Sequence, residues 1–138
     1  MKTFFLTIIA FVIIAGSVNA QARFVMKSTV GTIESNGTDV YQAIIDDISG
    51  YIEIAGQQKV GSMYNKIQIR TDGTRVGTLP CNATFSFNSN GSRISGSGTV
   101  TLTSRSGTLI SGKFSFSDNN GKTVTGFFEN IQCKDLGH

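Results

Sequence analysis

The chain has 138 residues, a formal net charge of +3, and a charged fraction of only 15 %. This length suits one domain with a modest hydrophobic core. Its 12 basic residues stand singly against 9 acidic ones, without a basic run or interleaved aromatic residues. The composition therefore predicts no nucleic-acid partner, because such surfaces concentrate positive charge.

Residues 1–20 resemble an export signal. Lys2 precedes an apolar run from Phe4 to Ala15, and the small residues Val18 and Ala20 form a cleavage pattern. The run is about a dozen residues, shorter than the roughly 20 that span a bilayer. We therefore expect cleavage before Gln21, a secreted or periplasmic domain over 21–138, and no membrane span afterwards. The alternative is an uncleaved N-terminal membrane helix.

From residue 23 onward, apolar and polar residues alternate with period two, which is typical of half-buried antiparallel strands. Turn-forming pairs such as Asp72-Gly73 and Asn90-Gly91 separate the alternating segments. Strands are expected near residues 23–30, 40–45, 50–55, 63–70, 75–79, 83–88, 98–104, 108–117 and 122–132. The sequence thus predicts one all-β domain, a single antiparallel meander of eight or nine strands that forms a barrel or a sandwich. The positions expected to face the interior include Ile52, Ile54, Ile67, Ile69, Phe85, Phe87, Leu102, Phe114 and Phe116.

Two segments leave the strand assignment open. Residues 39–48 could instead form one or two turns of amphipathic helix, although β-branched residues nearby favour a strand. The only proline, Pro80, is expected to mark the boundary between two elements, because proline is tolerated at the start of a strand.

Cys81 and Cys133 are the only cysteines. In an exported protein they can form one intramolecular disulfide, which oxidising compartments preserve. Their parity with neighbouring apolar residues places both on the inner face if the strands are unbroken. The sequence therefore predicts a Cys81–Cys133 disulfide. Two buried free thiols are the alternative.

Phe127 and Phe128 interrupt the alternation. Two adjacent rings point to opposite faces of a strand unless a bulge, for which Gly126 is a candidate, buries both. We favour the bulge. The alternative is that one ring of this pair contacts a ligand or a partner.

The residues that could support catalysis are few. The sole histidine, His138, is the last residue, which argues against histidine-based triads and zinc sites. Asp46, Asp47 and Glu53 could supply a carboxylate pair, but we interpret them as solvated turn residues. A calcium loop at 118–120 is weighed against a simple Asp-Asn-Asn-Gly turn, which we prefer. No catalytic residue, cofactor or metal ligand is predicted, and three short N-glycosylation patterns begin at Asn36, Asn82 and Asn90.

From about residue 50 to 133, the order of elements resembles small all-β domains of exported Bacteroidetes-type bacterial proteins. The similarity is clearest in Gly98-Thr99-Val100-Thr101-Leu102, in Ile110 to Phe116, and in Gly126 to Ile131. It rests on strand and turn residues. It implies a fold and transfers no catalytic residue.

Together these patterns predict a non-catalytic, exported β-barrel-like protein that binds a small ligand or a glycan. The alternative is a structural or protein-interaction module of the cell envelope, which uses an exposed face or an edge strand. A hydrolase or inhibitor with a site hidden from sequence is a third hypothesis.

Overall fold

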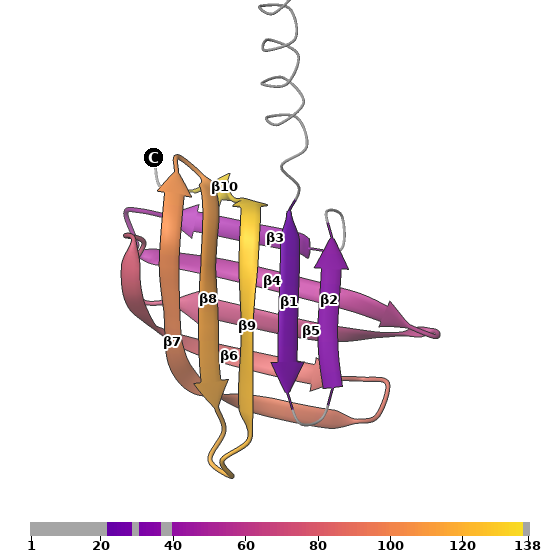
Figure 1. The fold of residues 1–138 in the computed structure, drawn as a ribbon. Coiled ribbons are helices and arrows are strands. Elements are labelled where there is room, and N and C mark those ends of the chain that lie inside the picture. Colours follow the sequence, from indigo (N-terminus) through magenta and orange to yellow (C-terminus); the bar gives the residue numbers. More distant parts are fainter. Residues whose placement is uncertain (1–21, 29–30, 37–39, 137–138) are drawn as a thin grey trace, which may run out of the picture.

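The computed structural model describes residues 22–28, 31–36 and 40–136, and in these ranges it is all-β, as the alternation predicts (Figure 1). The predicted export signal lies outside the described residues. Within the described part no helix is long and apolar enough to cross a membrane. The strands are β1 Arg23–Ser28, β2 Gly31–Asn36, β3 Val40–Asp46, β4 Tyr51–Val60, β5 Met63–Thr71, β6 Gly77–Phe87, β7 Ser92–Ser106, β8 Leu109–Ser117, β9 Thr123–Gln132 and β10 Lys134–Asp135.

The ten strands form one sheet in the order β10-β3-β4-β5-β6-β7-β8-β9-β1-β2. Strands β3 to β9 follow one another as an antiparallel meander, and the β1–β2 hairpin adds to β9. The short β10 pairs in parallel with β3. The predicted single meander of eight or nine strands is therefore corrected. Both the hairpin partner β2 and the final strand β10 were missed, because neither segment has a long alternating pattern.

The sheet curls into a half-barrel. In Figure 1, β3 to β6 run across the back, while β7, β8, β9, β1 and β2 run upright in front. Strand β7 has 15 residues and pairs with β6 along its first part and with β8 along its second. The segment Gly96-Ser97-Gly98 lies where the pairing with β8 begins, at Ser97. A Cβ atom at Gly98 would lie 1.9 Å from the Ser115 carbonyl oxygen, so only glycine permits this close approach.

The core fills the space inside the curl. All nine positions that alternation placed in the interior are buried, and the rings of Phe24 and Phe114 stack with centroids 5.5 Å apart. The ring centroids of Phe85 and Phe87 lie 3.9 Å apart. Burial of each such side chain contributes about 1.5–3 kcal/mol to folding. These side chains make the inside of the half-barrel a packed core.

One local expectation is confirmed and one is wrong. Residues 40–46 form strand β3, paired with β4, as the β-branched residues predicted, and not the alternative amphipathic helix. Pro80 lies inside β6, opposite Thr99, and does not mark a boundary. Its carbonyl accepts a bond from the Asp72 N–H on the side where β5 has already ended. Proline is tolerated at this position because the ladder with β5 ends at Thr71, opposite Cys81.

The predicted Cys81–Cys133 disulfide is not formed: both residues are free thiols. Their parity was correct, since both side chains are buried in the core. They lie at different levels of the barrel, however. Cys81 pairs with Gly98, whereas the Cys133 N–H binds the Thr108 carbonyl, ten residues further along the chain. Alternation predicts on which face of the sheet a side chain lies, but not its position along the strand relative to residues of other strands. A disulfide requires that both bring the two sulfur atoms together.

Phe127 and Phe128 point to opposite faces of β9. Phe128 is fully buried, whereas Phe127 is half-buried on the outer face, under the Arg23 guanidinium at 5.2 Å from its ring centroid. The expected bulge at Gly126 is wrong, because pairing with β1 runs through this residue without a shift. The register between β8 and β9 shifts later in β9, near Asn130, which has a φ of 53°. It therefore comes too late to turn both rings inward.

Candidate functional site

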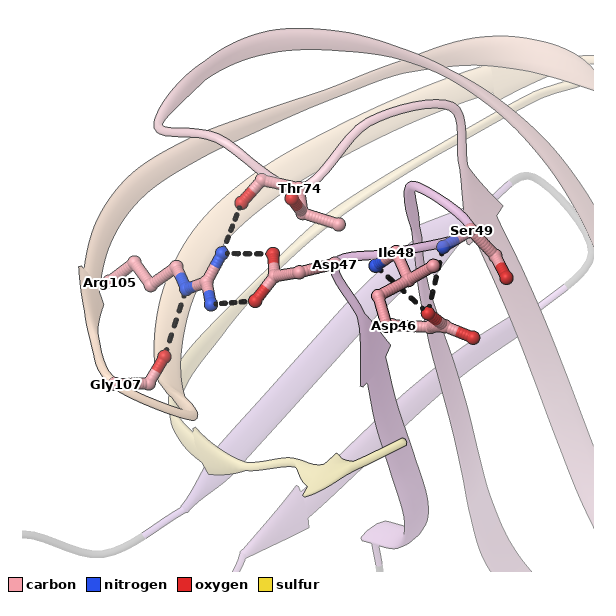
Figure 2. Close-up of polar contacts among 7 residues, drawn as sticks. All are labelled: Asp46, Asp47, Ile48, Ser49, Thr74, Arg105 and Gly107. Carbon is pink, nitrogen blue, oxygen red and sulfur yellow. Dashed lines mark hydrogen bonds and ion pairs between the residues drawn. The ribbon is translucent and has the colours of Figure 1, made fainter. Parts of the chain in front are cut away.

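The three carboxylates considered for catalysis serve separate structural roles. The Asp46 Oδ1 atom accepts bonds from the backbone N–H groups of Ser49, at 2.8 Å, and Ile48, at 3.1 Å (Figure 2). The bond from Ser49 is the main reason that the pKa of Asp46 is lowered. Asp46 thus stabilises the turn between β3 and β4.

Asp47 faces away from Asp46 and binds Arg105, which lies 58 residues later in the chain (Figure 2). The two bonds run from Nη1 to Oδ1 at 2.8 Å and from Nη2 to Oδ2 at 2.6 Å. Arg105 also donates to the carbonyls of Thr74, at 3.0 Å, and Gly107, at 2.8 Å. The Arg105 hydrogen bonds lower the pKa of Asp47 to about 2. Through these bonds Arg105 links the β3–β4, β5–β6 and β7–β8 connections at one end of the half-barrel.

Glu53, the third carboxylate, belongs to a different feature: a row of polar residues across the outer face. The strand registers place Glu53 opposite Arg70, Arg70 opposite Asn82, and Asn82 opposite Ser97. Ser97 in turn lies opposite Ser117. Five strands, β4 to β8, each contribute one residue, because cross-strand neighbours point to the same face.

This row lines a groove. Two adjoining depressions, of about 660 and 550 Å³, share Arg70, Asn82 and Ser97. Such volumes match those of small-ligand sites. The remaining lining is largely polar or small and comprises Ser49, Gly50, Tyr51, Glu53, Gln68, Thr71, Asp72, Pro80, Cys81, Ala83, Thr84, Ser95, Gly96, Gly98, Ser117 and Asn119. The short residues of the β7 bend leave space between the longer side chains of β4 to β6. We call this feature the polar groove.

The groove contains polar groups that no other residue satisfies. Within the described part of the chain, the side chains of Gln68, Asn82, Ser97 and Asn119 make no hydrogen bond. Other hydroxyls of the groove do pair with one another, as Thr84 does with Ser95 at 3.1 Å. The groove therefore offers amide and hydroxyl donors and acceptors to a ligand.

Arg70 is the one cationic side chain in the lining of the groove, and it borders both depressions. Its guanidinium lies 3.9 Å from the centroid of the Tyr51 ring, and its Nη1 atom lies 3.7 Å from Glu53 Oε2. The second distance is an ion pair that is too long for a hydrogen bond. Arg70 is thus oriented by an aromatic face and a carboxylate, while its N–H groups remain available to a ligand.

Sequence reasoning missed this groove. Glu53 was considered only together with Asp46 and Asp47, and Arg70 only as one of several dispersed cations. Alternation does show that residues 53, 68, 70, 82 and 97 face outward. Their assembly depends on the registers of three hairpins, which no single segment contains.

The 118–120 segment forms the turn that we preferred over a calcium loop. Asp118 Oδ1 accepts bonds from the N–H groups of Asn120, at 3.0 Å, and Lys122, at 2.8 Å. Within 22–28, 31–36 and 40–136, no three residues of the types His, Cys, Asp and Glu converge in a metal-binding arrangement.

Comparisons of this chain with protein-family models, with curated proteins and with solved structures find no match.

Proposed function

We propose that the protein is an exported, non-catalytic binding protein whose polar groove takes a neutral glycan. The observation that carries this proposal is the row of outward polar residues, Glu53, Arg70, Asn82 and Ser97, which lines a groove where several exposed amide and hydroxyl side chains make no hydrogen bond to the described chain. A sugar presents many hydroxyls that both donate and accept hydrogen bonds. A carboxylate, a guanidinium and an amide side by side complement that pattern.

The charge of the groove favours a neutral sugar over an acidic one. Glu53 lies beside Arg70 and offsets its positive charge locally. An anionic ligand would be repelled by Glu53, whereas hydroxyl groups can bind to both residues. The Tyr51 ring supports this arrangement, because it holds the Arg70 guanidinium in place beside Glu53.

The interior is a less suitable place for a ligand. Large side chains such as Phe85, Phe116 and Phe128 occupy it and pack against one another. An apolar ligand carried inside the barrel would have to displace them, at a cost of several kcal/mol. The polar outer face therefore supports glycan binding better than lipid carriage.

The test is a glycan-array screen of the protein without residues 1–20, followed by calorimetric titration of the strongest neutral hit. Asn82→Ala and Arg70→Ala should each weaken binding roughly tenfold, because each removes groups that bind the sugar directly. Asn88→Ala and Arg93→Ala make the same chemical changes at exposed positions outside the groove. These two controls should bind like the parent protein.

Two results would overturn this proposal. One is an absence of neutral glycan hits with protein shown to be folded. The other is a hit that Asn82→Ala and Arg70→Ala bind as tightly as the parent does, because such a glycan would have to bind outside the groove.

A second candidate function is a protein-interaction module of the cell envelope. The hairpin between β4 and β5 extends beyond the rest of the sheet (Figure 1), and its tip exposes Val60, Met63 and Tyr64. Val60 lies directly opposite Met63. Exposed apolar side chains at a projecting tip are typical of a contact surface. Native mass spectrometry of protein purified from its host tests this candidate, which predicts a co-purifying subunit that is lost in Val60→Ser/Met63→Ser.

A further inference from the structure

A depression separate from the polar groove lies on β1, β8 and β9, the strands in the front layer of Figure 1, and has a volume of about 490 Å³. It shares no lining residue with the polar groove. Its lining is mainly apolar with two lysines, and it includes Phe127, one of the two rings considered above as a contact for a ligand. The proposed glycan function uses none of these residues.

The floor of this depression is apolar although it lies on the outer face. Val25 lies directly opposite Phe127 across the β1–β9 pair, and both point outward. Val25 is only 6 % exposed, yet it does not belong to the core cluster inside the barrel. Most other outward positions of these strands carry serine, threonine or charged residues. Two neighbouring apolar side chains here form a small patch that favours contact with an apolar group.

Two cations border this patch. Lys113 lies opposite Phe127 on β8, and Lys27 lies opposite Thr125, two residues after Val25 and on the same face of β1. Both lysines are exposed, and neither is paired with a carboxylate of the described ranges. The third cation nearby, Arg23, lies over the Phe127 ring, 5.2 Å from its centroid, and is paired with Glu34 at 3.6 Å, so a ligand contacts the part of the ring that Arg23 leaves open. No acidic residue lines the depression, so its uncompensated charge is positive.

We propose that this depression binds a small organic anion that has an apolar body, such as a medium-chain acyl or aryl carboxylate. The apolar body lies on Val25 and Phe127, and the anionic group lies between the ammonium groups of Lys27 and Lys113. The volume is enough for one such molecule. Charge complementarity selects an anion, and the apolar floor distinguishes this ligand from an inorganic ion or a neutral sugar.

The test uses octanoate as the probe and 1-octanol as its neutral counterpart, with amide chemical shifts of the isotope-labelled protein as the measurement. Octanoate should shift the amides of residues 25–27, 113 and 125–127, and high salt should weaken its binding. The same concentration of 1-octanol should bind markedly more weakly. The variants Lys27→Gln and Lys113→Gln should each weaken octanoate binding roughly fivefold.

Three variants define the site. Phe127→Ser should weaken octanoate binding as well, because it removes half of the apolar floor. The double variant Lys59→Gln/Lys66→Gln removes the same charge from exposed positions outside the depression and should leave binding unchanged. All variants are first shown to unfold at the temperature of the parent protein, and a destabilised Phe127→Ser is replaced by Phe127→Tyr/Val25→Thr.

Four outcomes would overturn the proposal. They are absence of the named shifts, equal affinity for octanol, equal loss of affinity in the Lys59/Lys66 control, and binding of vesicles that contain phosphatidylglycerol without binding of free octanoate. The last would assign the lysines to a membrane surface. Retention of the glycan affinity in Lys27→Gln/Lys113→Gln would show that the two sites are independent.

Discussion

At the scale of single residues, Arg105 is the side chain with the most polar contacts that the structure resolves. It binds Asp47 through two hydrogen bonds and reaches the carbonyls of Thr74 and Gly107. Its side chain is 22 % exposed, so water only partly competes for these bonds. Arg105→Gln should lower the free energy of unfolding by about 1 kcal/mol, measured by urea denaturation. Arg105→Lys keeps the charge but cannot form the paired bonds, so it should recover less than half of the loss.

The same pair predicts a pH dependence. The Arg105 hydrogen bonds lower the pKa of Asp47 from 3.8 to about 2, so the unfolded chain takes up this proton more readily than the folded one. The stabilisation is therefore complete above pH 4 and is lost as the pH falls toward 2. Asp47→Asn should be less stable than the parent protein at pH 6, and the difference should vanish near pH 2. A difference that is constant over this range would show that the carboxylate charge is not involved.

The two cysteines give a residue-scale prediction about reactivity. Burial raises the pKa of Cys133 to about 11 and also raises that of Cys81. Since the thiolate is the reactive form, neither side chain should react with a maleimide in the folded protein at pH 7. After denaturation without reductant, mass spectrometry should find two labels per chain. Finding none would restore the disulfide that the sequence suggested.

At the scale of elements, the bend of β7 depends on two glycines. A Cβ atom at Gly96 would lie 1.7 Å from the Ser117 carbonyl oxygen, and one at Gly98 would lie 1.9 Å from that of Ser115. Gly98→Ala should therefore lower stability by about 2–3 kcal/mol, measured by thermal or urea unfolding. Ser97→Ala, between the two glycines, should change it by less than about 0.5 kcal/mol. Equal effects of both variants would contradict the proposed close packing.

Alternation predicted most elements but not their limits. It placed β5 and β8 within one residue of their observed bounds, because apolar side chains alternate along the whole of both strands. It divided β6 into two strands at Pro80 and missed β2. It also placed β1 at 23–30, close to its observed range, although the adjacent buried residues Phe24, Val25 and Met26 interrupt the alternation there. Pattern analysis thus succeeds where a long segment has one apolar and one polar face, and it fails where the segment, like β2, is too short to show the pattern.

At the scale of the whole molecule, the interior was more predictable than the candidate sites. Each buried position is identified by its own neighbours along the chain. The polar groove instead assembles Glu53, Arg70, Asn82 and Ser97 from four strands, and the Asp47–Arg105 pair joins segments 58 residues apart. Both depend on strand register and on the curl of the sheet. A single sequence carries no direct signal of either, and this is also why the disulfide prediction failed.

We propose above that the protein binds a neutral glycan in the polar groove across β4 to β8. The most direct measurement maps amide chemical shifts of the labelled protein during titration with the neutral glycan selected on the array. The shifts should concentrate at residues 51–53, 68–70, 82–84 and 95–98, with little change at residues 25–27 and 125–127. Shifts concentrated at the β4–β5 hairpin tip or on β1 and β9, with the groove unaffected, would contradict it.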